Sequence, residues 1–172
     1  MKDGPSFGPE LVVKFRGNFD FLGLYDLLFA WLRDHNYRPV EKKHKEKAGD
    51  GREVELVIVG EAEITEYVNY NAEFSIHVWD MKTVEVKEGD KTKTMDWGRL
   101  EVKLKGGITV DPKDKIPGTS GILKAMDTFL KKVALWRELE FLHEDNMGAT
   151  ITKVQAMVKK FLNMDSSETA FG

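Results

Sequence analysis

The chain has 172 residues, of which 41% are hydrophobic and 32% charged, a balance typical of one globular domain with a sizeable core. Its net charge of −3 argues against a general attraction to nucleic acid or anionic lipid, and the absence of cysteine excludes disulfides and thiolate chemistry. The polar residues 1–10 lack the apolar core of a signal peptide, and no apolar run approaches the ~20 residues of a membrane span. We therefore expect a soluble cytoplasmic protein.

The two ends of the chain differ in composition from the rest. Residues 1–9 combine glycine and proline with polar residues, and residues 165–172 are mostly polar. Between them we find the patterns of strands and helices, with no internal repeat and no low-complexity block. We expect a flexible lead at 1–9, a single α+β domain at 10–164 and a flexible tail at 165–172.

A short strand and a helix come first. Apolar residues alternate from Leu11 to Phe15, and the strand is expected to end at Gly17. From 18 to 37 the period changes to that of an amphipathic helix, with Asp20 as its N-cap and Pro39 beyond its end. The apolar stripe of this helix consists of Phe21, Leu24, Tyr25, Leu28, Trp31 and Leu32.

The next two predicted strands form a hairpin. Residues 37–47 contain Pro39 and many lysines, features that protect an edge strand against pairing with another chain. Residues 48–51 have the composition of a turn, and the returning strand follows. A straight strand from Val54 to Val78 would span about 80 Å at ~3.3 Å per residue, so the chain must turn between Gly60 and Tyr67.

The stretch from Ala62 to Val86 defines the sheet. Its even positions are apolar and most of its odd positions are polar, the pattern of antiparallel strand with one face buried and one face in water. A two-residue turn at Gly89-Asp90 would place Val84 opposite Met95 and Lys82 opposite Trp97.

The apolar phase of the following strand shifts at Gly98. We predict a β-bulge there, with one extra residue that restores the inward face and places Val78 beside Leu100. The same register pairs residues on the wet face as follows: Glu73 with Lys105, Ser75 with Lys103, His77 with Glu101, and Trp79 with Arg99.

Two helices are expected at the end of the chain. A loop at 111–118 leads to a helix from Ile122 to Leu142, Gly148 ends this helical segment, and Thr150 starts the last helix. A second apolar side of the first of these helices consists of Leu135, Leu139 and Leu142. We expect it to be covered by the stripe of the last helix: Ile151, Val154, Met157, Val158, Phe161 and Leu162.

These elements predict an α+β fold. One twisted antiparallel sheet of about five strands has a helix after its first strand and two C-terminal helices packed on one face. The order of elements resembles the helix-grip layout of small lipid- and metabolite-binding domains, in which a cavity often lies between the sheet and the long helix. This analogy concerns the layout alone.

The layout leads to a first hypothesis of function. We expect a non-enzymatic binding module that holds an apolar or amphipathic small ligand between the sheet and the helix from Ile122 to Leu142. The residues expected to line the site are Tyr70, Phe74, Ile76, Phe129 and Trp136. The alternative is a structural or assembly protein that self-associates or binds a protein partner through apolar helix surface. A third alternative is an enzyme with dispersed catalytic residues.

Other candidate sites are weaker. Four residues open a predicted helix, where free N–H groups can bind an anion, although such residues ordinarily cap helices: Thr119, Ser120, Gly121 and Lys124. The wet face carries large side chains that could form a recognition platform: Tyr67, His77, Trp79 and Met81. Its cross-strand charge pairs favour an ordinary solvent-facing sheet, and its glutamates would repel nucleic acid.

The sequence predicts neither a metal site nor a catalytic site. The histidines lie on different predicted elements, without the spacing of metal ligands: His35, His44, His77 and His143. No nucleophile elbow, nucleotide-binding glycine loop or carboxylate pair is present. We therefore expect no cofactor.

Overall fold

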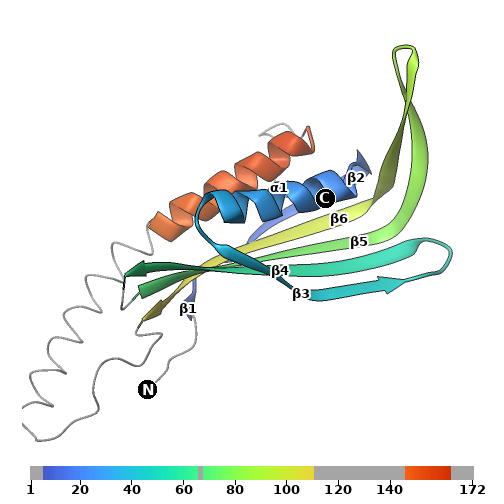
Figure 1. Cartoon of the computed structure of the whole chain (residues 1–172). Coiled ribbons are helices and arrows are strands. Elements are labelled where there is room, and N and C mark those ends of the chain that lie inside the picture. Colours follow the sequence, from blue (N-terminus) through green and yellow to red (C-terminus); the bar gives the residue numbers. More distant parts are fainter. Residues whose placement is uncertain (1–5, 66–67, 111–145, 164–172) are drawn as a thin grey trace, which may run out of the picture.

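The computed structural model describes residues 6–65, 68–110 and 146–163 (Figure 1). Within these ranges two strands and one helix come first: β1 (Ser6–Phe7), β2 (Leu11–Phe19) and α1 (Phe21–Asp34). Four longer strands follow: β3 (Arg38–Lys47), β4 (Arg52–Thr65), β5 (Val68–Glu88) and β6 (Lys91–Val110). A C-terminal helix occupies residues 146–161.

The strands form one antiparallel sheet in the order β1-β6-β5-β4-β3. β2 also pairs with β6. Between β1 and β2, the backbone N–H of Gly8 donates a hydrogen bond to the carbonyl of Gly106 in β6. β1 and β2 thus share one edge of the sheet, and five strand positions lie side by side. The α+β class and the antiparallel sheet of about five strands are confirmed.

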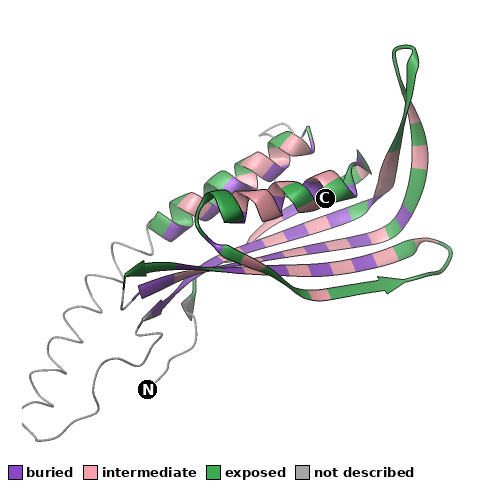
Figure 2. Cartoon of the chain, in the orientation of Figure 1, coloured by how far each residue is buried: buried purple, intermediate pink, exposed green. Residues whose placement is uncertain are grey.

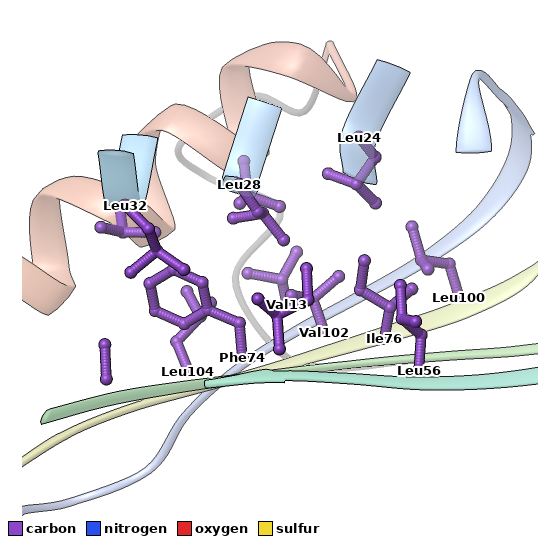
Figure 3. Close-up of a cluster of buried hydrophobic side chains, with 14 of the residues drawn as sticks. Val13, Leu24, Leu28, Leu32, Leu56, Phe74, Ile76, Leu100, Val102 and Leu104 are labelled. Carbon is purple, nitrogen blue, oxygen red and sulfur yellow. The ribbon is translucent and has the colours of Figure 1, made fainter. Parts of the chain in front are cut away.

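The helices α1 and 146–161 lie on the same face of the sheet (Figure 1). Figure 3 shows leucines of α1 pointing toward the apolar side chains of the strands below. Phe74 and Ile76 of β5 are fully buried in this layer. The predicted helix from Ile122 to Leu142 lies outside the described residues.

The first helix has the predicted boundary. Asp20 is the N-cap, and its Oδ1 accepts a hydrogen bond of 3.0 Å from the N–H of Gly23. The N–H of Phe21 donates at 3.1 Å to a carboxylate far along the chain, Asp96 Oδ2 of β6. This second contact ties the start of the helix to the β5–β6 hairpin, and no local sequence signal predicts it.

The hairpin of β3 and β4 is also as predicted. Among the described strands β3 pairs with β4 alone, and most of its residues are exposed (Figure 2). β4 ends at Thr65, directly opposite Val68 at the start of β5. The change of direction therefore falls inside the predicted interval between Gly60 and Tyr67.

The register of the β5–β6 hairpin is confirmed, but the position of the bulge is corrected. Trp79 pairs with Arg99, and Lys82 pairs with Trp97. Between these pairs β5 holds two residues and β6 only Gly98, so the extra residue belongs to β5. The chain accommodates it at Asp80, whose φ is 56°. Gly98 lies opposite the bulge, and its lack of a side chain leaves room for the bulged backbone of β5.

The C-terminal helix corrects two further expectations. Residues 146–161 are continuously helical, so Gly148 does not end a helix. The ~1 kcal/mol cost of a helical glycine is offset by the burial of Met147 and Ile151 beside it. The apolar stripe of this helix, including Val154 and Val158, packs into the sheet core. We had expected this stripe to cover the leucines of the preceding helix instead. The leucines at 135, 139 and 142 lie outside the described residues, so their packing stays a prediction.

Candidate functional site

A pocket of about 270 Å³ lies where the β1–β2 edge, the end of β6 and the start of the C-terminal helix meet. Its walls are mainly apolar and include Leu11, Ile108, Met147 and Ile151. Thr152 adds a hydroxyl, and none of the described residues that line the pocket is charged. This composition suits an apolar ligand, or one with a single polar end.

Glycines on β6 allow the helix to come this close to the sheet. A Cβ built on Gly106 would lie 2.5 Å from Met147 Cε and 2.7 Å from Ile151 Cγ1. Any side chain at this position would therefore require Met147 and Ile151 to move. Gly107 adjoins it in the floor of the pocket. The sequence signal for this feature is the Gly-Gly pair that interrupts the alternation of β6.

Two tyrosines lie near the pocket, Tyr37 buried and Tyr70 half-buried. The hydroxyl of Tyr37 donates to Met147 Sδ at 3.7 Å, and burial raises the pKa of Tyr37 to about 12. Burial also raises the pKa of Tyr70, although its hydrogen bond with Asn146 opposes the shift. Both phenols are neutral at physiological pH, so these two side chains add no charge beside the pocket.

The raised pKa of Tyr37 predicts a loss of stability at alkaline pH. The unfolded chain loses this proton near pH 10, whereas the folded chain keeps it to about pH 12. The unfolded state then binds fewer protons, so the free energy of unfolding falls between pH 10 and 12. We expect the free energy of unfolding to fall by about 1–2 kcal/mol, less than the full pKa shift implies, because the ring is not completely shielded from solvent. Denaturant unfolding of the wild type and Tyr37→Phe checks this. Parallel pH curves for the two proteins would contradict it.

A cluster of polar side chains occupies the other face of the sheet at the same end. Asn69 is only 3% exposed, and its Nδ2 donates to Glu61 Oε1 at 2.7 Å. Asn71 Nδ2 donates to Thr109 Oγ1 at 2.7 Å. Asn69 Oδ1 is buried without a hydrogen-bond partner among the described residues. Here β5 and β6 are buried on both faces, whereas their middle parts are buried on the helix face alone (Figure 2).

The structure does not bring the predicted ligand-binding residues together in one described site. Phe74 and Ile76 have no exposed surface and belong to the closed core, and Tyr70 is half-buried. None of the three lines the pocket. The remaining predicted residues lie outside the described residues: Phe129, Trp136, Thr119, Ser120, Gly121 and Lys124.

The wet face of the sheet has the predicted register, and His77 lies opposite Glu101 as expected. The side chain of His77, however, contacts Glu53 of β4. His77 Nε2 lies 2.8 Å from Glu53 Oε1, and its ring stacks on Trp79 with centroids 3.8 Å apart. Met81 does not belong to this face. The bulge at Asp80 turns the side chain of Met81 toward the core, where Met81 is 5% exposed. The predicted platform is therefore smaller than the sequence suggested, and Tyr67 lies outside the described residues.

Neither a metal-binding cluster nor a membrane-spanning helix occurs among the described residues. No group of three or more histidine, aspartate or glutamate side chains is placed to hold a metal ion in these ranges. Nor does any helix in the described part of the chain have the length and apolarity to cross a membrane.

The fold defines an α+β protein with a five-strand antiparallel sheet and helices on one face. Compared with known proteins, the chain matches no family model and none of the curated proteins.

Proposed function

We propose that the protein is a non-enzymatic binding module that holds a small apolar or amphipathic ligand between β6 and the C-terminal helix. The observation that carries the proposal is the apolar pocket of about 270 Å³ between these two elements. Ligand pockets commonly measure about 300–1,000 Å³, which favours a ligand at the small end of that range. An engineered cavity of only about 150 Å³ accepts benzene, so the space is sufficient for a small hydrocarbon group.

The layout of the elements supports the same proposal by analogy. A helix follows the first long strand, and the C-terminal helix covers the same face of the sheet. This arrangement resembles helix-grip domains, in which lipids and metabolites bind between the sheet and the long helix. A shared layout does not specify a ligand, so the chemistry of the pocket decides its class.

A series of linear alcohols tests the proposal. We expect calorimetric titration of the full chain to show binding that tightens about fourfold with each added methylene, as ~0.8 kcal/mol per buried CH₂ requires. The gain should stop once the chain fills the pocket. Native mass spectrometry of the purified protein should also be run, because a co-purified ligand would identify the natural class directly.

Two variants of the C-terminal helix locate the binding site. Gly148 lines the pocket, and no described atom lies within 4 Å of a Cβ built there, so Gly148→Leu should fill the space. The gain in affinity should then stop at a shorter alcohol. Ala156→Leu adds the same side chain at an exposed position of the same helix and should change nothing. If both variants bound the alcohols equally, the alcohols would not be binding in this pocket. A wild type that binds no alcohol but forms dimers would favour the assembly alternative.

A further inference from the structure

The face of the sheet opposite the helices carries many charged side chains that neutralise one another. Lys43 Nζ lies 2.6 Å from Glu55 Oε1, and this hydrogen bond lowers the pKa of Glu55. Glu101 lies between Lys14 and Lys103, at 3.9 and 3.5 Å. Such pairing is typical of a solvent-facing sheet and needs no ligand to explain it.

The corner where β2 meets β6 departs from this pattern. Arg16 lies directly opposite Arg99, and like charges in this position destabilise a sheet. Arg99 is compensated by Asp80, whose Oδ2 lies 3.0 Å from its Nε and 2.9 Å from its Nη2. Arg16 lies over the ring of Trp97 at 5.6 Å and forms no ion pair with any described carboxylate. One of two adjacent guanidinium groups is therefore uncompensated.

A hollow of about 520 Å³ lies at the same corner. The residues that line it include three cations, Lys14, Arg16 and Arg99, and a single carboxylate, Glu101, which is already paired with lysines. Trp79 provides an aromatic wall. The volume is that of a small-molecule site, and the lining has an excess of positive charge.

We propose that this corner binds a small organic phosphate. A phosphate monoester carries a charge of about −1.5 to −2 at pH 7, and each planar guanidinium group can donate two parallel hydrogen bonds to its oxygens. A phosphate bound between Arg16 and Arg99 would replace their repulsion with attraction. Lys14 adds a third positive charge, and the ring of Trp79 offers contact to the organic part of the ligand.

The surroundings favour a small ligand over a polyanion. Carboxylates follow along the same face on β4 and β5, including Glu53, Glu55 and Glu73, and the whole chain has a net charge of −3. These charges would repel a nucleic acid strand or an anionic membrane laid across the sheet. The corner is also distinct from the apolar pocket, because Arg99 and Gly106 lie about 23 Å apart along β6 at ~3.3 Å per residue, on opposite faces.

Calorimetric titration of the full chain with phenyl phosphate tests the proposal. At low ionic strength we expect phenyl phosphate to bind more tightly than inorganic phosphate, and benzyl alcohol to show no binding at this corner. Added salt should weaken the interaction, because the charges are exposed. Quenching of tryptophan fluorescence that disappears in Trp79→Phe would place the ligand in the hollow.

Matched arginine variants complete the test. Arg16→Gln should weaken phenyl phosphate binding about tenfold, as loss of a charge-assisted hydrogen bond predicts. It should not lower the melting temperature, because it also removes the repulsion between Arg16 and Arg99. Arg33→Gln is the control, because Arg33 is likewise an exposed arginine over an aromatic ring, 5.2 Å from Phe29. The proposal fails if the wild type binds no phenyl phosphate, if Arg16→Gln binds as well as the wild type, or if Arg33→Gln loses as much affinity.

Discussion

Replacement of Phe74 by alanine is expected to lower the free energy of unfolding by about 3–5 kcal/mol, the range for truncation of a buried phenylalanine. Phe74 has no exposed surface and lies in the layer between β5 and the helices (Figure 3). The centroid of its ring is 6.0 Å from that of Trp31. The surrounding leucines come from a helix and from neighbouring strands, which cannot move together into the space left by the ring. The variant therefore loses transfer free energy and keeps a cavity.

Ser75→Ala is the matched control, one position along the same strand. Its side chain points to the opposite face, where it is half-buried and opposite Lys103. We expect a change of less than about 0.5 kcal/mol. Chemical denaturation of both variants, with equal m-values, measures the difference. Similar losses in the two variants would mean that the even-numbered face of β5 is not the buried one.

The second large effect is expected at Gly98, where an alanine should cost roughly 3 kcal/mol. A Cβ there would lie 2.9 Å from the carbonyl oxygen of Trp79 and 3.0 Å from Val78 Cγ1. The nearest atom belongs to the backbone of the bulge, so no side-chain rotation can relieve the contact. Overpacking of this kind typically costs about 1–3 kcal/mol, and a backbone neighbour places Gly98→Ala at the upper end.

Gly148→Ala provides a control with the same chemical change and the opposite sign. Gly148 is helical and exposed, and no described atom lies within 4 Å of its Cβ position. Alanine should therefore stabilise the helix by up to about 1 kcal/mol. Equilibrium unfolding measures both variants, and hydrogen exchange should show faster opening of the β5–β6 hairpin in Gly98→Ala alone. If both substitutions stabilised the protein, the close approach at Gly98 would be wrong.

The two proposed binding sites make different demands on a ligand. The pocket beside the C-terminal helix has no charged lining, and its affinity should follow the apolar area buried. The corner at Arg16 should depend on charge and on ionic strength. A single amphipathic phosphate cannot span them, because they lie on opposite faces of the sheet. The two titration series can therefore succeed or fail independently.

The sequence by itself determined strands β2 to β6, helix α1 and most of the sheet register. Alternation along β5 identified its buried face, and the turn at Gly89-Asp90 placed Val84 opposite Met95. Asp20 was recognisable as the cap of α1 because capping depends on neighbours three residues away. These features depend on short-range periodicity, which a single sequence contains in full.

Tertiary structure alone decided which strand holds the bulge, where the last helix docks and where a pocket forms. The phase change near Gly98 is the same whichever strand takes the extra residue. The choice of β5 depends on how closely its backbone can approach the glycine opposite. Likewise, the pocket joins residues near positions 8, 107 and 150, and forms because Gly106 lets the helix contact β6. Contacts between residues so distant in sequence depend on the packing of whole elements, and no local pattern contains them.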